Sequence, residues 1–192
     1  MIKKIVIIGP ESTGKSTLCK QLAEHYNTLW CPEYAREYLL KHGTDYSYED
    51  LLIIAKGQIA HEENYELRMM NDELKTHSKF ITHNSKLFLD TDMIVMKVWC
   101  EFVFGKCHQL ILDELKTRKY DLYLLCNIDL PWVKDELREY PNEAPRIELF
   151  NIYKNILEKQ QTPWTLISGF GESRLHNAIH AINNAMGYSS LH

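Results

Sequence analysis

The feature that most constrains this 192-residue chain is an apolar run that leads directly into a glycine-rich loop. Ile5–Ile8 is β-branched and apolar, which is typical of a buried strand. Residues 9–16, GPESTGKS, follow at once and match the pattern G-x-x-x-x-G-K-[ST] at every fixed position. Leu18, Leu22 and Tyr26 then recur at helical spacing. Strand, loop and helix in this order predict a phosphate-binding loop.

Each fixed position of this loop has a physical role in holding phosphate groups. Gly9 and Gly14 allow backbone conformations in which successive N–H groups point inward, and the start of the following helix adds a partial positive charge. We expect Lys15 to reach the β- and γ-phosphates of a nucleoside triphosphate, ATP or GTP, and Ser16 to ligate Mg²⁺. A glycine turn without a ligand is the alternative, and the complete motif disfavours it. The loop residues predicted to bind the nucleotide are Gly9, Glu11, Ser12, Thr13, Gly14, Lys15, Ser16 and Thr17.

The composition is that of an ordinary globular domain and argues against several classes of partner. Apolar residues make up 45% of the chain and charged residues 25%, and the length suits a single domain over residues 1–192. A net charge of −4 offers no electrostatic footprint for nucleic acid. No apolar run approaches the ~18 residues that a membrane span needs. The 5 cysteines are odd in number and lack C-x-x-C spacing, so we expect reduced thiols and a cytoplasmic location.

Apolar segments alternate with amphipathic ones along the rest of the chain. The predicted strands after the first are Thr28–Cys31, Lys86–Asp90, Tyr120–Cys126 and Trp164–Ile167. The predicted helices after the loop helix are Glu33–Leu40, Tyr48 to about His77, Met93–Phe104, Gln109–Arg118, Arg146–Gln161 and Glu172–Met186. Strands separated by helices predict a three-layer α/β P-loop NTPase domain with a parallel sheet of about five strands. Ligands of such sheets gather at the carboxyl ends of the strands.

Residues 129–146 form a polar segment between the fourth predicted strand and the helix that follows. The segment contains three prolines and many charged residues, a composition typical of a mobile surface excursion, and we interpret it as a lid. Arg138 and Arg146 lie in it. Together with Arg36, they are candidates for gripping phosphates as negative charge builds during transfer. Solvated surface arginines are the alternative interpretation.

Three carboxylates follow the second and third predicted strands. Asp90 comes directly after an apolar strand, the position from which a carboxylate holds the Mg²⁺ of a P-loop site. Capping of the next helix is the alternative, but Asp92 or Thr91 can cap it equally well, which favours the metal role for Asp90. Glu33 could take a proton from a substrate hydroxyl, with Asp92 as its rival. An ordinary acid in the first turn of a helix is the alternative for Glu33.

Several of these motifs together carry a family resemblance. They are GPESTGKSTL at 9–18, EYARE at 33–37, LDTD at 89–92 and Pro131-Trp132-x-x-Asp135-x-x-Arg138. Their order and spacing run over nearly all of the chain, which resembles the ribosylnicotinamide kinase domain of bifunctional NadR proteins in a stand-alone form. The resemblance implies a nucleoside- or adenylate-kinase-like fold. It also implies ATP-dependent phosphorylation of the 5′-hydroxyl of nicotinamide riboside, which gives nicotinamide mononucleotide in NAD salvage.

The motifs and the resemblance together assign roles to particular residues. The predicted catalytic residues are Lys15, Glu33, Asp92 and Arg138. The predicted substrate contacts are Glu33, Tyr34, Arg36, Asp92, Trp99 and Trp132. Ser16 and Asp90 are the predicted Mg²⁺ ligands, and Arg138 and Arg146 join the loop residues as ATP contacts.

The acceptor is the part of this prediction with the most alternatives. Pro32 and Val103 stand where the family has a tryptophan and a tyrosine. The nucleotidyltransferase domain of the bifunctional members has no counterpart in this sequence, so the resemblance does not assign the adenylyl-transfer step. A kinase of another nucleoside or small metabolite, or a P-loop ATPase switch that acts on a protein, are the alternatives. The expected partner is a small nucleoside-like substrate rather than nucleic acid or a membrane, and a homo-oligomer stays open.

Overall fold

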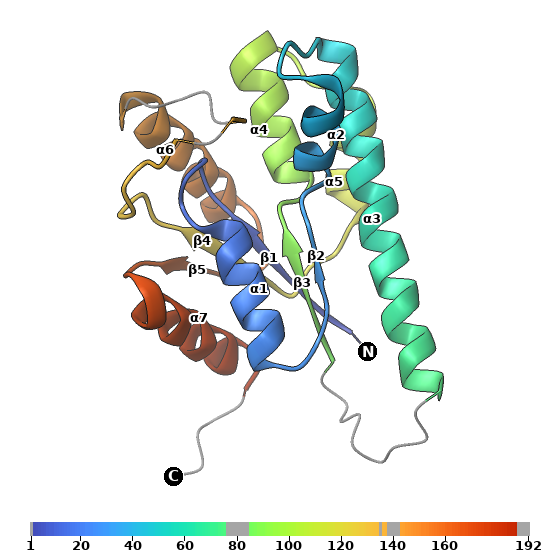
Figure 1. Ribbon diagram of the computed structural model, residues 1–192, viewed down its shortest axis with the longest axis vertical. Helices are drawn as coiled ribbons and strands as arrows, with labels where there is room; N and C mark the ends of the chain where they lie inside the picture. Colours follow the sequence, from blue (N-terminus) through green and yellow to red (C-terminus); the bar gives the residue numbers. More distant parts are fainter. Residues whose placement is uncertain (1, 76–84, 135, 138–142, 188–192) are drawn as a thin grey trace.

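Five parallel strands form the central layer of the protein in a computed structural model that describes residues 2–75, 85–134, 136–137 and 143–187 (Figure 1). The strands are β1 (Lys3–Ile8), β2 (Trp30–Cys31), β3 (Lys86–Asp90), β4 (Leu122–Cys126) and β5 (Trp164–Ile167). Their order in the sheet is β2-β3-β1-β4-β5, and every neighbouring pair is parallel. The predicted five-stranded parallel sheet is confirmed.

Seven helices are described, and each lies where the sequence pattern predicts one. They are α1 (Lys15–His25), α2 (Tyr34–His42), α3 (Tyr48–Lys75), α4 (Met93–Phe104), α5 (Gln109–Thr117), α6 (Glu143–Lys159) and α7 (Gly171–Ala185). The main difference is the start of α6, which begins three residues before the predicted Arg146. Pro145 tolerates this position because its fixed φ suits the first turn of a helix. The last four residues of the expected lid, 143–146, are therefore helical.

The sheet alternates the side chains of its central strand between two helical layers. Ile5 and Ile7 of β1 pack against α1 and α7, whereas Val6 and Ile8 pack on the opposite face against α4 and α6. All four side chains are fully buried. A strand covered on both faces needs apolar residues at every position, which explains the uninterrupted apolar run before the loop.

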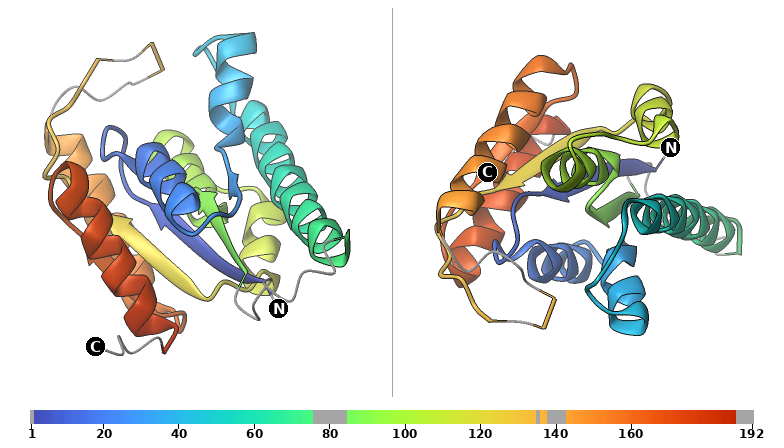
Figure 2. Two further views of the ribbon diagram at one scale, coloured as in Figure 1. Left: turned by 60° about the horizontal axis from the view of Figure 1, so that its bottom comes forward. Right: turned by 90° about the horizontal axis from the view of Figure 1, so that it is seen from above.

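The helices form two outer layers and a third cluster at one edge. The helices α1 and α7 lie side by side on one face of the sheet (Figure 2). Side chains of α4 and α6 cover the other face. The helices α2, α3, α4 and α5 also pack together around a separate apolar cluster that includes Leu39, Leu51 and Met96. Among the described helices, none combines the length and the hydropathy that crossing a bilayer requires.

The strand order brings the candidate residues to one edge of the sheet. Because β1 pairs with β3 on one side and β4 on the other, the loop after β1 lies between the ends of both neighbours. The chain leaves β2 toward Glu33 and β3 toward Asp90 at the same edge. The carboxyl ends of parallel strands thus assemble residues that are far apart in sequence.

Candidate active site

The loop between β1 and α1 has the backbone shape of an anion site. Gly9, Ser12 and Gly14 have positive φ angles of 145°, 56° and 75°, a pattern that lets successive N–H groups point inward. Glycine is required at position 9, because a Cβ there would lie 2.9 Å from the carbonyl oxygen of Cys126. Gly14 is the N-cap of α1 and has no side chain with which to cap it. The first N–H groups of α1 are therefore available to a bound phosphate.

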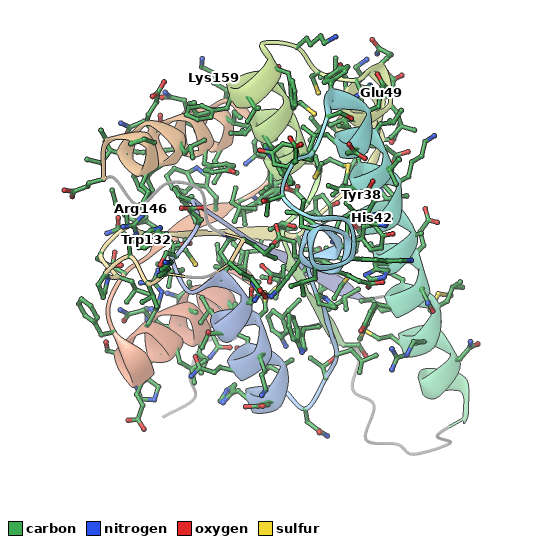
Figure 3. All side chains as sticks on the ribbon, turned by 45° about the horizontal axis from the view of Figure 1, so that its top comes forward. Tyr38, His42, Glu49, Trp132, Arg146 and Lys159 are labelled. Atoms are coloured by element: carbon green, nitrogen blue, oxygen red, sulfur yellow. The ribbon has the colours of Figure 1, made fainter. Side chains whose placement is uncertain are left out.

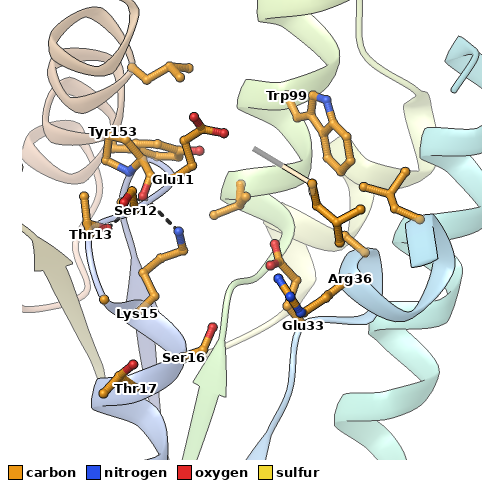
Figure 4. A pocket seen from close by; sticks show the side chains of 18 of the residues that line it. Glu11, Ser12, Thr13, Lys15, Ser16, Thr17, Glu33, Arg36, Trp99 and Tyr153 are labelled. Carbon is orange, nitrogen blue, oxygen red and sulfur yellow. Dashed lines mark hydrogen bonds between the residues drawn. The ribbon is translucent and has the colours of Figure 1, made fainter. Parts of the chain in front are cut away.

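Two side chains of the loop share one carbonyl group. Thr13 is fully buried, and its Oγ1 donates a hydrogen bond of 2.7 Å to the carbonyl oxygen of Pro10. Lys15 is the first residue of α1, and its Nζ donates to the same oxygen at 3.0 Å (Figure 4). The ammonium group therefore lies over the loop, where a phosphate oxygen would be a stronger, charge-assisted acceptor than a carbonyl.

A cavity of about 260 Å³ opens beside the loop and Lys15. The loop forms one wall, and residues of α2, α4 and α6 form much of the other (Figure 4). The predicted site residues that line the cavity are Gly9, Glu11, Ser12, Thr13, Gly14, Lys15, Ser16, Thr17, Glu33, Arg36 and Trp99. Apolar and aromatic side chains complete the lining: Ala35, Leu39, Val95, Phe102, Leu137, Leu149 and Tyr153. The cavity thus joins an anion site to a largely apolar wall that carries one acidic side chain, Glu33, and one basic side chain, Arg36.

Glu33 is the carboxylate on the wall that faces the loop. It is the N-cap of α2, and its side chain makes no capping hydrogen bond to the described helix. Burial and the neighbouring charge of Asp90 raise the pKa of Glu33 to about 7, against the opposing effects of Lys15 and Arg36. A carboxylate with a pKa near neutrality is suited to accept a proton at physiological pH.

Asp90 and Ser16 offer the oxygen atoms that a Mg²⁺ ion prefers. Asp90 is buried at the end of β3, and its Oδ1 has no hydrogen-bond partner among the described residues. Burial raises the pKa of Asp90, while the charge of Lys15 and a hydrogen bond with Ser16 oppose this shift. In the described part of the chain, no three His, Cys, Asp or Glu side chains cluster as a metal site. The pair therefore fits a Mg²⁺ that takes its other ligands from phosphate and water, as nucleotide-bound Mg²⁺ does.

Asp92 is placed differently from the prediction. Its Oδ1 accepts a hydrogen bond of 3.0 Å from Ile94 N and caps α4, and its Oδ2 accepts one of 2.7 Å from Tyr123 Oη. Asp92 is 1% exposed and does not line the cavity. Burial raises the pKa of Asp92 to about 7 as well, but both carboxylate oxygens are already engaged inside the protein. The position of Asp92 therefore does not support the predicted role as substrate contact or base, because the side chain is the helix cap.

Tyr34 also lies outside the cavity. Its ring packs over Gly57 of α3, where a Cβ would lie 2.0 Å from Tyr34 Cε1, and it meets the ring of His61 edge-on at 4.9 Å. The backbone N–H of Tyr34 donates to Gln58 Oε1 at 2.8 Å. Tyr34 therefore anchors α2 to α3, and the prediction of a direct substrate contact is not supported by its position.

Trp132 lies in the segment after β4, and Arg146 lies in the first turn of α6 (Figure 3). The Nε1 of Trp132 donates to Glu11 Oε1 at 3.0 Å, so the indole contacts the phosphate loop rather than the cavity. Arg146 is 5% exposed, and its Nη2 donates to the carbonyl oxygen of Leu130 at 3.1 Å. Arg146 does not line the cavity either. The predicted catalytic and nucleotide-binding residue Arg138 lies outside the described residues.

Arg174 of α7 is a structural residue of this site that the sequence reasoning missed. It is 5% exposed and forms an ion pair of 2.7 Å with Asp129 Oδ1. Its Nη2 donates to the carbonyl oxygens of Thr13 and Asn127 at 2.9 and 3.1 Å. One guanidinium group therefore ties the phosphate loop to the segment after β4. The available signal in the sequence was the apolar Ala178 four residues later, which places Arg174 on the same face of the helix.

A model of the AAA domain family matches residues 4–174. The chain belongs to this family. The match begins in the first strand and extends into the last helix, so it includes the loop, Glu33 and the ends of β3 and β4. This AAA domain therefore contains every element that lines the cavity.

The chain is similar to one part of longer proteins. It is 27% identical to the trifunctional NAD biosynthesis/regulator protein NadR of Escherichia coli (strain K12), over 97% of this chain and 43% of the relative. The chain thus spans less than half the length of that relative. A crystal structure of NadR protein in complex with NR matches with a TM-score of 0.75 and 24% identity, over 97% of this chain and 50% of that one. The predicted resemblance to NadR-type proteins is confirmed.

A second solved structure has the same fold over nearly its whole length. The crystal structure of thymidylate kinase from Ehrlichia chaffeensis matches with a TM-score of 0.61 and 16% identity, over 95% of this chain and 98% of that one. At this identity the likeness concerns the fold alone. The AAA domain therefore has the fold of the P-loop nucleoside and nucleotide kinases, as predicted.

Proposed function

We propose that the chain is an ATP-dependent kinase that phosphorylates the 5′-hydroxyl of nicotinamide riboside to nicotinamide mononucleotide. The observation that carries the proposal is that a single cavity joins a phosphate-binding loop to a carboxylate on the facing wall. Phosphoryl transfer requires an anion site for the donor and a base close to the acceptor hydroxyl. The similarity to NadR, whose structure was determined with NR, supports this acceptor.

The proposed reaction uses the loop and Glu33 from opposite sides of the acceptor. Loop N–H groups and Lys15 hold the β- and γ-phosphates of ATP, and Lys15 exchanges the Pro10 carbonyl for a phosphate oxygen. Ser16 and Asp90 would hold Mg²⁺, which neutralises charge on those phosphates. The acceptor oxygen bonds to the γ-phosphorus of ATP as the bond between that phosphorus and the β,γ-bridging oxygen breaks. The hydroxyl proton passes to Glu33, and ADP leaves.

Trp99 is the aromatic surface that we assign to the base of the acceptor. It lines the cavity from α4, and its Nε1 donates a hydrogen bond of 2.8 Å to Tyr46 Oη. This bond occupies the polar edge of the indole and fixes its orientation, so the ring face can stack against a flat heterocycle. Arg36 lines the same wall and would bind an oxygen-rich group of the substrate.

A kinase of another nucleoside is the second candidate. Leu39, Val95 and Phe102 make much of the acceptor wall apolar, so few described groups there could distinguish one base from another by hydrogen bonding. The same transfer chemistry would then act on a different nucleoside. The lid role of residues 129–146 stays a proposal, since 135 and 138–142 lie outside the described residues.

A nucleoside panel tests the proposed function. Release of ADP, coupled to an optical assay, is measured with nicotinamide riboside, the common nucleosides and no acceptor. We expect nicotinamide riboside to stimulate release above the background hydrolysis rate, and Lys15→Ala to lower this turnover at least about 10²-fold because a charge-stabilising group is lost. Circular dichroism checks that the variant is folded. Stimulation by another nucleoside alone contradicts the substrate, and no stimulation by any acceptor contradicts the kinase.

A further inference from the structure

A buried glutamine of α3 bonds to the chain on both sides of the Pro32-Glu33 dipeptide. Gln58 is 2% exposed, in the middle of a 28-residue helix. Its Oε1 accepts the 2.8 Å hydrogen bond from Tyr34 N, and its Nε2 donates to Cys31 Sγ at 3.9 Å. Cys31 is the last residue of β2 and Tyr34 is the first residue of α2. One side-chain amide therefore holds the chain immediately before and after the dipeptide that contains Glu33.

The Glu33 carboxylate is not used to cap α2 and is available to the cavity. The first N–H groups of a helix have no partner within the helix, and the side chain of the N-cap residue commonly accepts from one of them. Glu33 is the N-cap of α2 but makes no such bond. Gln58 supplies the acceptor for Tyr34 N, the first N–H group of the helix, which an N-cap side chain does not normally reach. The carboxylate of Glu33 lines the cavity, on the wall that faces the phosphate loop (Figure 4).

A glycine next to Gln58 lets α2 approach this closely. A Cβ at Gly57 would lie 2.0 to 2.5 Å from three atoms of the Tyr34 ring, which therefore rests directly on the backbone of α3. Glycine inside a helix is about 1 kcal/mol less favourable than alanine, so a glycine here needs a packing reason. The Tyr34 ring supplies that reason. Gly57 and Gln58 together form a seat on α3 that receives the ring and the peptide of Tyr34.

We propose that Gln58 is a positioning residue for the phosphoryl transfer: it holds the peptide next to Glu33 and so places the Glu33 carboxylate at the acceptor hydroxyl. The inference rests on the proposed function, in which Glu33 receives the proton. Gly57 contributes by giving the Tyr34 ring its place. Neither residue lines the cavity, and both act through the first turn of α2.

The first test compares Gln58→Met with a matched core variant. Methionine has a similar length and volume but cannot accept the hydrogen bond of Tyr34 N. We expect kcat to fall at least tenfold while the KM for ATP is unchanged, because the loop is untouched. Ile54→Val, one turn earlier on α3 and also buried, is the control that weakens the same helix but leaves the hydrogen bond between Gln58 and Tyr34 N in place, and it should keep kcat. Equal kcat values for Gln58→Met and the wild-type protein would overturn the proposal.

A second test uses the steric contact and still gives an answer if Gln58→Met does not fold. Gly57→Ala pushes against the Tyr34 ring and should also lower kcat at least tenfold. In a Tyr34→Ala background the ring is gone, so the same substitution should have no further effect on kcat. An equal loss of kcat in both backgrounds would show that Gly57 acts independently of Tyr34. This result would contradict the claim that Gly57 acts by receiving the Tyr34 ring.

A third measurement separates failure of this inference from failure of the proposed function. Hydrogen exchange at the Tyr34 amide, read by NMR, reports the bond to Gln58 whether or not any acceptor is phosphorylated. We expect a protected amide in the wild-type protein and faster exchange in Gln58→Met, with Ile54→Val close to the wild type. Unchanged protection in Gln58→Met would refute the positioning role even if the kinase is active. Loss of protection in a protein that phosphorylates no acceptor would refute only the proposed function.

Discussion

Two carboxylates of the site region have a pKa raised to about 7 but occupy different environments. Burial raises the pKa of both Glu33 and Asp92 to about 7. Asp92 is enclosed by the N-terminus of α4 and by Tyr123, whereas Glu33 lines the cavity beside the loop. A perturbed pKa therefore identifies both residues as unusual, and only the position of the side chain separates a structural acid from a candidate base.

The raised pKa of Glu33 makes stability depend on pH. The folded protein holds the proton more tightly than the unfolded chain, whose reference value is 4.5, so stability is lost as pH rises through about 7. At high pH the folded protein must hold Glu33 in its ionised form, which burial and Asp90 disfavour, and Glu33→Gln removes this free-energy cost. We expect the variant to gain stability relative to the wild type at pH 8.5, by at most about 3 kcal/mol, and to gain less at pH 5.

Urea unfolding at the two pH values, in EDTA and without nucleotide, measures the difference. Glu148→Gln, an exposed substitution on α6, is the control and should behave alike at both pH values. A gain for Glu33→Gln that is the same at pH 5 and pH 8.5 would contradict the shift.

At the scale of elements, the segment after β4 and the phosphate loop are joined by side chains. Trp132 Nε1 donates to Glu11, Val133 N donates to Ser12 Oγ at 2.9 Å, and Ser12 Oγ donates to the carbonyl of Pro131 at 3.4 Å. Three consecutive residues therefore lie along the outer side of the loop. We infer that the segment stabilises the loop in its observed shape before any ligand arrives, which would lower the cost of binding the proposed nucleotide.

Trp132→Phe tests this contact because phenylalanine keeps an aromatic ring but lacks the N–H donor. One hydrogen bond contributes about 1 kcal/mol, so we expect the KM for ATP to rise roughly fivefold while the KM for the acceptor is unchanged. Glu11→Ala removes the other partner and should give the same rise, without further effect in the double variant. Steady-state kinetics with each substrate varied in turn make the comparison. A raised acceptor KM with a normal ATP KM would return Trp132 to the substrate-binding role predicted from the sequence.

At the scale of the whole molecule, the residues that are candidates for binding nucleotide, metal and acceptor come from separate parts of the fold. The loop leads from the central strand into α1, Asp90 ends β3, and Glu33 follows the edge strand β2. The cavity also includes side chains of α4 and α6 from the opposite layer. Bound nucleotide would therefore contact elements on both faces of the sheet. Its binding free energy adds to the stability of the whole domain.

Asp90→Asn should uncouple the Mg²⁺ effect from this stabilisation. ATP at one hundred times its Kd adds about 2.7 kcal/mol, a rise of roughly 5 to 10 °C in Tm for a domain of this size. We expect the wild-type protein to gain more from ATP with Mg²⁺ than from ATP with EDTA, because Asp90 and Ser16 would ligate the ion. In Asp90→Asn, the gain in Tm from ATP with EDTA should equal that of the wild-type protein. The additional gain from Mg²⁺ should be smaller.

Thermal unfolding followed by fluorescence makes this measurement. Asp45→Asn, in an exposed loop, is the control and should keep both gains. An undiminished Mg²⁺-dependent gain in Asp90→Asn would mean that Asp90 is not a ligand.

Most of the fold was predictable because its signals are local. The apolar run of β1, the complete loop motif and the alternation of strands with helices each depend on spacing within a few residues, and the sheet confirms them. The loop end of the cavity follows from the same motif. The start of α6 was less clear from sequence, because the proline-rich composition before it resembles a loop although Pro145 fits the first turn of a helix.

What the sequence alone determined is thus the order of the elements and the shape of the loop, which backbone geometry and apolar spacing specify. Only the tertiary structure decided that Glu33 rather than Asp92 lines the cavity, that Trp132 contacts the loop, and that Gln58 and Arg174 lie behind the site. These relations join residues 24 to 161 positions apart. The physical reason is that the direction of a side chain across two elements depends on how those elements pack, and no local periodicity records that packing.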